Sequence, residues 1–166
     1  YSCSNSSSES KTAGDNAEMV TSDFEAEFVG HYVYSGPDTL QDPKCTDTLT
    51  DWRTIVDGMG NSNIMGDIKV HFDFCGNYDG HYGDCYAFMV DKNSDTLFVS
   101  CEGQVLGGRT ADHPPFVDSY WKDDFVILGG SGRFQGASGK GKTDDFNSAA
   151  DSNTHHRWSG TITMKK

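Results

Sequence analysis

The sequence has few helix-forming residues and no long hydrophobic run. Ala and Leu are sparse among the 166 residues, and no apolar stretch approaches the roughly 18 residues that a membrane-spanning helix needs. Tyr, Phe, Val and Thr are plentiful, and there are 19 glycines, a balance typical of strands joined by tight turns. The length suits one domain with a core of its own. The composition therefore indicates a single β domain without a membrane helix.

Positive charge is also scarce, because 13 Lys and Arg residues stand against 25 Asp and Glu residues. The resulting net charge of −12 repels nucleic acid and anionic membrane surfaces. We therefore expect no nucleic-acid partner, and membrane contact only through a lipid attached to Cys3. The simplest interpretation of the charge is the solubility of an acidic secreted protein.

None of the five cysteines has the C-x-x-C spacing of a zinc site. Four of them, Cys45, Cys75, Cys85 and Cys101, lie in the part of the chain expected to fold. Paired thiols in an oxidising compartment are the simpler interpretation, which indicates a secreted or cell-surface protein. Four cysteines allow three pairings, and the sequence does not choose among them. Our working hypothesis joins Cys75 to Cys85 across one hairpin and Cys45 to Cys101 between more distant strands.

Residues 1–22 are polar, rich in Ser and without periodicity. They are predicted to form a tether or flexible arm ahead of a folded domain at residues 23–166. The start of this arm, YSCSNSSSES, resembles a bacterial lipoprotein processing site, with a small residue before Cys3 and a Ser/Asn-rich tether after it. On that resemblance Cys3 carries a lipid anchor at a cell surface or outer membrane. If Tyr1 is the true mature end, Cys3 is instead a free thiol or part of an intermolecular bridge.

From Asp23 onward, short runs alternate between apolar and polar residues and are separated by turn-forming clusters. A period of two with one polar face indicates strands that pack on one side. We count about eight such strands, which suits a small closed barrel or a sandwich, and we predict an all-β fold. The clearest alternating runs are 23–28, 67–74, 97–102 and 158–165.

The segment GASGKGKT at 136–143 fits the phosphate-binding pattern G-x-x-x-x-G-K-[ST]. A working loop of this kind opens a helix, whose N-terminal amides hold the phosphate. The residues after Thr143 have no amphipathic face, and two aspartates follow the loop directly. We therefore interpret the match as accidental.

The longer run LGGSGRFQGASGKGKTDDF resembles the glycine hairpin G-G-[ST]-G-[KR]-[FY]-x-x-A-x-G of the allene oxide cyclase and dirigent barrels, which many secreted bacterial barrel proteins of unknown function share. The resemblance implies that one strand ends, turns over glycines and restarts, and that a final strand at 158–164 closes the barrel around a snug apolar cavity. With it, we predict a single antiparallel β-barrel of about eight strands. No functional residue of those families can be carried over from it. The matching positions are Gly129, Gly130, Gly132, Arg133, Phe134, Ala137 and Gly139.

The loop GNYDGHYGD at 76–84 combines aromatic and carboxylate side chains, which suits a sugar or metal site on a rigid loop; the alternative is an exposed hairpin tip. The candidate binding residues are Tyr78, Asp79, His81, Tyr82 and Asp84. No catalytic set is evident, and we expect no catalytic residue, resident metal or cofactor.

Three functions remain open at this stage. The first is a non-enzymatic surface module that binds a protein partner or assembles, with the arm adding a strand to a neighbour. The second is a barrel that binds or converts a small hydrophobic ligand, and the third is glycan binding through the 76–84 loop. An interior filled by Phe72, Phe74, Trp158 and Met164 would exclude the second function, whereas an open cavity with one or two polar groups would support it.

Overall fold

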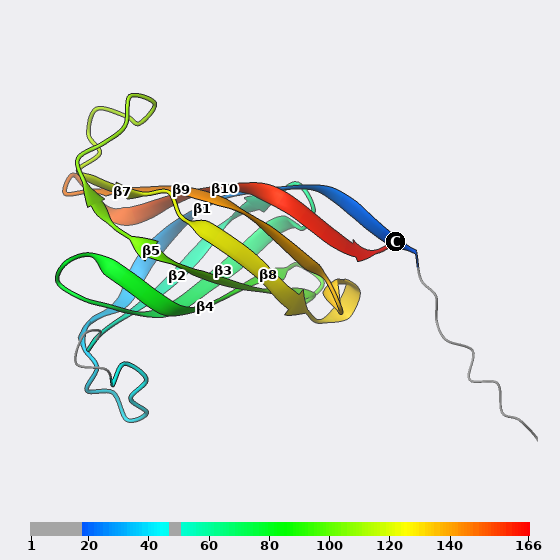
Figure 1. The fold of residues 1–166 in the computed structure, drawn as a ribbon, viewed down its shortest axis with the longest axis horizontal. Coiled ribbons are helices and arrows are strands. Elements are labelled where there is room, and N and C mark those ends of the chain that lie inside the picture. Colours follow the sequence, from blue (N-terminus) through cyan, green and yellow to red (C-terminus); the bar gives the residue numbers. More distant parts are fainter. Residues whose placement is uncertain (1–17, 47–50) are drawn as a thin grey trace, which may run out of the picture.

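A computed structural model describes residues 18–46 and 51–166, which form an antiparallel β-barrel (Figure 1). Eight strands form the wall: β1 (Met19–Pro37), β2 (Trp52–Ser62), β3 (Gly66–Gly76), β4 (His81–Asp91), β5 (Thr96–Gln104), β8 (Asp124–Gly130), β9 (Ser138–Ser148) and β10 (Asp151–Lys165).

Each wall strand pairs with its neighbours in chain order, and β10 pairs with both β9 and β1, which closes the sheet. The prediction of one antiparallel barrel of about eight strands is therefore confirmed. Two short strands, β6 (Leu106–Gly107) and β7 (Ser119–Trp121), lie in the β5–β8 connection and extend the sheet beside β9.

The segment predicted as an arm overlaps the first wall strand. β1 begins at Met19, which pairs with Lys165, so residues 19–22 belong to the barrel. Residues 1–17, which include Cys3, lie outside the described residues. Among the described residues the one helix is η1 (Gly132–Phe134), and no helix is long and apolar enough to cross a membrane.

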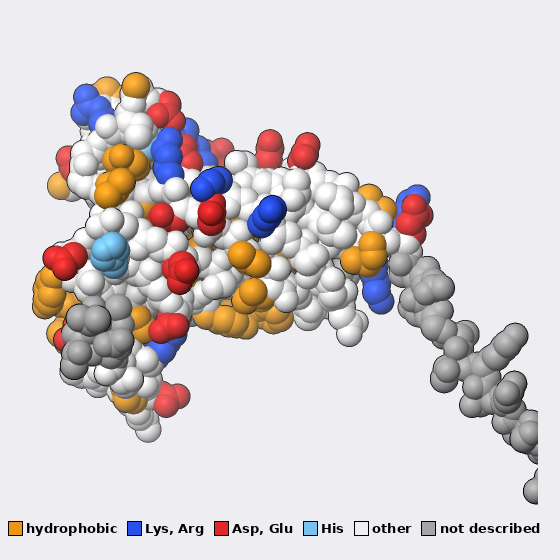
Figure 2. Space-filling view, in the orientation of Figure 1, with side chains coloured by type: hydrophobic (Ala, Val, Ile, Leu, Met, Phe, Trp, Pro, Cys, Tyr) orange, Lys and Arg blue, Asp and Glu red, His pale blue; other side chains and the backbone are white. Residues whose placement is uncertain are grey.

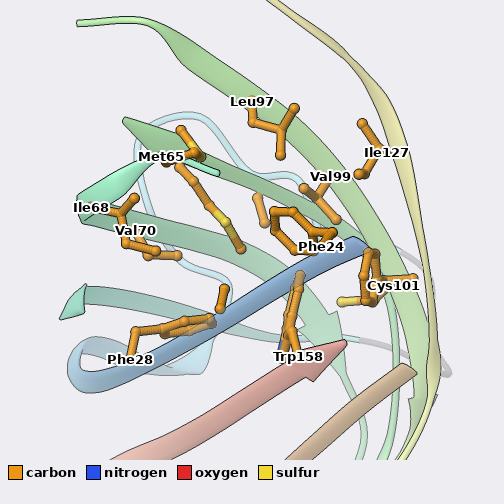
Figure 3. Packing of buried hydrophobic residues seen from close by; sticks show 14 of the residues in the cluster. Phe24, Phe28, Met65, Ile68, Val70, Leu97, Val99, Cys101, Ile127 and Trp158 are labelled. Carbon is orange, nitrogen blue, oxygen red and sulfur yellow. The ribbon is translucent and has the colours of Figure 1, made fainter. Parts of the chain in front are cut away.

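The alternating pattern places one face of every wall strand inside the barrel. The residues of β3 and β5 that the pattern assigned to the interior, such as Val70 and Leu97, are buried there. Figure 3 shows them in one buried cluster with Phe24 of β1 and Trp158 of β10. Burial of these side chains is the main favourable contribution to folding.

The glycine hairpin closes one end of the barrel. β8 ends at Gly130, η1 makes a single turn, and β9 begins at Ser138, so the chain ends a strand, turns and restarts as expected. Phe134 is fully buried against the barrel core. Gly132 has φ +59°, and a Cβ there would lie 1.7 Å from Oδ1 of Asp95, so only glycine fits this turn.

The opposite end carries two long connections, the first described over residues 38–46 and the second at 105–123 (Figure 1). The first is fastened to the wall by a disulfide between Cys45 and Cys75. The pairing of Cys75 with Cys85 and of Cys45 with Cys101 is therefore wrong. The reason is that the 38–45 segment folds back along the end of β3, a path that no local sequence pattern reveals.

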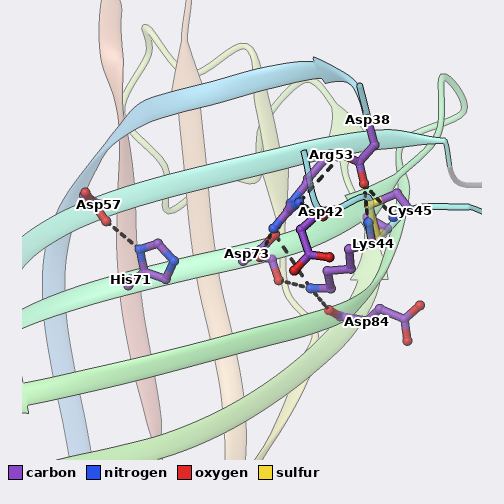
Figure 4. A network of polar contacts seen from close by, with 10 residues as sticks. Asp38, Asp42, Lys44, Cys45, Arg53, Asp57, His71, Asp73 and Asp84 are labelled. Atoms are coloured by element: carbon purple, nitrogen blue, oxygen red, sulfur yellow. Dashed lines mark hydrogen bonds and ion pairs between the residues drawn. A yellow bond between two sulfur atoms is a disulfide. The ribbon is translucent and has the colours of Figure 1, made fainter. Parts of the chain in front are cut away.

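Polar contacts hold the same connection in place (Figure 4). The Asp38 carboxylate accepts backbone N–H bonds from Lys44 at 2.6 Å and Cys45 at 2.7 Å. Arg53 on β2 donates to both carboxylate oxygens of Asp73 on β3, at 2.8 and 2.6 Å. These bonds give this end of the barrel a fixed rim.

Candidate ligand cavity at the open end of the barrel

The barrel interior is open at the end that carries the long connections. A cavity there has about 80 Å³ that the centre of a water molecule can occupy, and about 550 Å³ of atom-free space when its open mouth is included. Its wall is mainly aromatic and aliphatic, with a few polar groups. The lining residues are Tyr32, Val56, Phe72, Phe74, Tyr82, Cys85, Cys101, Val105, Trp121, Asp145, Asn147, Thr154, His156 and Trp158.

The interior is thus filled at one end and open at the other. Phe72 and Trp158, two of the residues that could have filled it, are buried but also form part of the cavity wall. The aromatic rings pack against one another, with Phe72 and Trp158 at 5.7 Å between centroids. A wall of this kind offers flat apolar surfaces to a ligand.

Asp145 is the buried carboxylate of the cavity wall. It lies on β9 with 1% exposure, and Trp158 Nε1 donates to its two oxygens at 3.0 and 3.2 Å. Burial raises the pKa of the Asp145 carboxyl above its usual range, although the neighbouring His156 and Trp158 favour the ionised form. The cavity therefore holds an acidic group in surroundings of low polarity.

His156 lies beside this carboxylate on β10. Its ring stacks on Phe28 at 4.5 Å between centroids, and Nε2 lies 2.7 Å from the Thr154 hydroxyl. Nδ1 lies 3.2 Å from Oδ1 of Asp145, which is ion-pair distance, but it is out of line for a hydrogen bond. Among the described residues this buried nitrogen has no hydrogen-bond partner. Such groups are uncommon in proteins and call for an explanation.

A second polar group lies at the β4 side of the cavity. The Tyr82 hydroxyl donates to Oδ2 of Asp123 at 2.8 Å. Burial raises the pKa of Tyr82, and the nearby Cys101 and Asp123 raise it further. The phenol therefore stays protonated and acts as a fixed part of the wall.

The predicted 76–84 binding loop does not hold together as one site. Tyr78 is 85% exposed and packs edge-on against Trp52, with Asp79 and His81 also exposed. Tyr82 turns into the cavity instead, and the exposed Asp84 sits on the wall strand β4 at φ +46°. The loop is pinned by Cys45 through Cys75, not by Cys85.

Cys85 and Cys101 are free thiols in the cavity wall. They are cross-strand partners on β4 and β5, and their sulfur atoms lie 3.4 Å apart. The expected disulfides at these two positions are therefore not formed in this structure.

The sequence did not reveal Asp145 and His156 as cavity residues. Alternation implied that His155 and His156 face opposite sides, which is the case, since His155 bonds to Asp151 while His156 is buried. It could not say which histidine faces inward. Asp145 lies among the residues after Thr143, which show no amphipathic face, so no signal marked it.

A cluster of Asp112, His113 and Asp144 has ligand atoms close enough for a metal ion. The His113 ring is already bonded to Asp144 at 2.9 Å, and Lys122 Nζ lies 3.1 Å from both carboxylates. The ammonium group occupies the place of a cation, and we interpret the cluster as an ion-pair network.

No protein-family model matches this chain, and no curated protein matches its sequence. Among solved structures, the chain is similar to a protein of unknown function from Clostridium acetobutylicum ATCC 824. The two are 10% identical, and the match covers 87% of this chain and 98% of that one with a TM-score of 0.46.

Proposed function

We propose that this barrel binds a small, mostly apolar ligand in the cavity at its open end. The observation that carries the proposal is the cavity itself: an aromatic wall in which a buried carboxylate and a histidine nitrogen without a hydrogen bond lie side by side. Apolar pockets with a few convergent polar groups are the usual form of small-molecule sites.

The size and chemistry of the cavity limit the ligand. A dry engineered cavity of about 150 Å³ holds benzene, so about 80 Å³ suits one ring that extends partly into the mouth. A hydroxyl or amino group on that ring would reach a carboxylate and an imidazole that are otherwise poorly solvated.

The test is a titration of the ¹⁵N-labelled protein, followed by NMR, with three probes: toluene, p-cresol and 2-phenylethylamine. We expect shifts confined to the backbone amides of the cavity strands, and tighter binding of a probe with a polar group than of toluene. The absence of localised shifts with all three probes at millimolar concentration would overturn the proposal.

Three variants sharpen this test. Val105→Trp places a large ring at the partly exposed rim and should abolish binding, whereas Val126→Trp on the outer wall should leave it unchanged. Asp145→Asn keeps an acceptor for Trp158 and removes the group that can carry a negative charge. It should weaken binding of 2-phenylethylamine by roughly 10- to 100-fold and leave toluene binding unaltered.

A second function, binding of a protein partner or self-assembly, is favoured by an exposed aromatic patch on the outer wall. On β4 and β5, Tyr86 stacks on Phe98 at 5.9 Å and meets Phe88 edge-on, and Val126 and Leu128 of β8 are about half exposed. Figure 2 shows apolar side chains gathered along this part of the wall. Contiguous patches of this kind often mark protein contacts.

The mode of assembly differs from strand addition at the barrel wall. Among residues 18–46 and 51–166, all eight wall strands are paired on both sides, so the wall has no free edge. Sedimentation of the protein and of Leu128→Asp is the test. A dimer that dissociates in the variant supports the patch, and a monomer in both forms rejects self-assembly.

The remaining expectations stay proposals. The Cys45–Cys75 disulfide supports secretion or a cell-surface location, and the glycine hairpin supports membership of the allene oxide cyclase and dirigent superfamily. Glycan binding is weaker than ligand binding, because Tyr82 lines the cavity and leaves Tyr78 as the exposed tyrosine of the loop.

A further inference from the structure

We propose that Cys85 and Cys101 form a reversible disulfide across β4 and β5, with a small hydroperoxide as the oxidant. The proposal goes beyond ligand binding and can be tested without a ligand. It makes the cavity wall a redox-sensitive site.

The geometry of the pair carries the proposal. Cys85 and Cys101 stand directly opposite each other in the β4–β5 ladder, with both side chains in the barrel interior. The Cys101 thiol donates to the Cys85 sulfur at 3.4 Å. A disulfide bond is about 2.05 Å long, so the sulfurs need to approach by roughly 1.3–1.4 Å.

An irregularity in β4 supplies the freedom for this approach. The β4–β5 register shifts between Tyr82 and Cys85, and the intervening Asp84 has φ +46°. A β-bulge interrupts the regular ladder and bends its strand, and bulges are frequent beside functional sites. Cys85 is the first residue that pairs with β5 after this bulge, so it can move without disturbing the ladder from Tyr86 onward.

The same protein already holds one disulfide close to this pair. Cys75, bonded to Cys45, pairs with Gly83 across β3 and β4, two residues before Cys85. A chain that carries such a bond belongs in surroundings where thiols are oxidised. Burial explains why the second pair can persist as thiols there: the two side chains are 4% and 7% exposed, and they are reached through the cavity.

The cavity also limits the oxidant to a small molecule. A thiolate of the pair attacks one oxygen of the hydroperoxide, forming a sulfenic acid and releasing the other oxygen as water or alcohol. The second thiol then attacks the sulfenic sulfur, forming the disulfide and releasing water. Two thiols and one hydroperoxide thus give one disulfide, one water and one further water or alcohol.

Oxidation would alter the cavity, because both sulfurs belong to its wall. Drawing β4 toward β5 moves Tyr82 on β4, whose hydroxyl is tied to Asp123. This consequence rests on the proposed ligand site, whereas formation of the disulfide does not.

The experiment uses the full chain with Cys3→Ser, with its Cys45–Cys75 bond intact, treated with hydrogen peroxide. We expect the intact mass to fall by two hydrogen atoms, a non-reducing digest to yield a peptide that joins Cys85 to Cys101, and dithiothreitol to reverse both. In matched Cys85→Ser and Cys101→Ser variants, the remaining thiol should gain one oxygen, trapped by dimedone, and form no bridge.

Two results would overturn the proposal. The first is oxygen adducts on Cys85 or Cys101 without a bridge between them. The second is an unchanged mass of the protein that has both thiols, under peroxide treatment that does oxidise the Cys85→Ser and Cys101→Ser variants. Binding of p-cresol to the reduced and oxidised forms is then compared by NMR. If the bridge forms but p-cresol binds neither form, the redox inference stands and the ligand proposal fails.

Discussion

Asp91 ties the turn after β4 to the hairpin at the closed end of the barrel. Its Oδ1 accepts the backbone N–H groups of Asn93 and Asp95 at 2.8 and 3.1 Å, and its Oδ2 pairs with Arg133 at 2.9 Å. The side chain is almost fully buried. Although burial opposes ionisation, these hydrogen bonds and the guanidinium hold the pKa of Asp91 below its usual value.

Asp91→Asn should therefore destabilise the barrel by about 1.5–3 kcal/mol at pH 7, because the amide keeps an acceptor but loses the charge that faces Arg133. The folded pKa lies below the unfolded one, so the stabilisation is present above about pH 4 and is lost as the pH falls through the folded pKa. Urea denaturation at several pH values measures this difference. Asp124→Asn, which removes an exposed pair with Lys142, is the control and should change stability little. Equal losses for both variants would contradict the assignment.

The Cys101 thiol gives a second pH prediction. Its hydrogen bond to Cys85, its burial and the nearby Asp145 and Asp123 raise the pKa of Cys101 well above its usual value. Because the thiolate is the reacting species, attack of the Cys101 thiol on hydrogen peroxide should accelerate about tenfold per pH unit between pH 7 and 9. The rate of bridge formation, followed by mass, checks this. A rate that levels off near pH 7 would show that a readily ionised thiol reacts instead.

At the scale of elements, the glycine hairpin offers a matched series. Gly132→Ala combines a left-handed φ with a clash against Asp95, whereas Gly136→Ala has φ +77° and open space around its Cβ. We expect Gly136→Ala to cost about 1–2 kcal/mol and Gly132→Ala to cost more. Gly107→Ala, which meets neither constraint, should be neutral. Urea midpoints give the order, and a Gly132→Ala variant as stable as Gly107→Ala would contradict this account of the turn.

The Cys45–Cys75 bond fixes the 38–45 connection to β3. Its cysteines are 30 residues apart. A cross-link that closes a loop of this length lowers the entropy of the unfolded chain and thereby stabilises the fold by about 3–4 kcal/mol. Replacing both with Ala should lower the stability by that amount and speed hydrogen exchange in this connection. Unchanged exchange there would mean that the contacts of Asp38, Lys44 and Arg53 alone hold it.

The elements differ in how far the sequence reveals them. β3, β5 and β10 alternate apolar and polar residues, and the hairpin has its glycines at fixed spacing, so strands and turn were predicted correctly. β9 was expected only from the glycine hairpin that precedes it. Its inward positions include Thr143 and Asp145, and these polar residues break the alternation that marks a strand.

For the whole molecule, the closed barrel follows from the sequence, whereas its open end does not. Strand count and alternation suit a barrel or a sandwich, and the resemblance of the glycine hairpin selects the barrel. The space inside depends on which side chains from different strands lie at the same level along the barrel axis, and the sequence does not give this. The sequence pattern predicts Trp158 and Phe72 as core residues, and they are buried, but they also line the cavity. The reason is that the glycine hairpin with Phe134 covers one end of the barrel, whereas the long connections leave the other end open.

Ligand binding should also stabilise the whole barrel. A probe present at 100 times its dissociation constant adds about 2.7 kcal/mol to the free energy of unfolding. We expect p-cresol to raise the thermal midpoint of the native protein but not of Val105→Trp, as measured by circular dichroism. An equal rise in both would place the probe elsewhere on the protein.

The most direct test of the ligand proposal is native mass spectrometry of the protein purified from its own source, repeated after denaturation. The account predicts one small molecule per chain in the native spectrum, and its release on unfolding. A bare chain in the native spectrum that also stays bare when p-cresol, toluene and 2-phenylethylamine are added would contradict it.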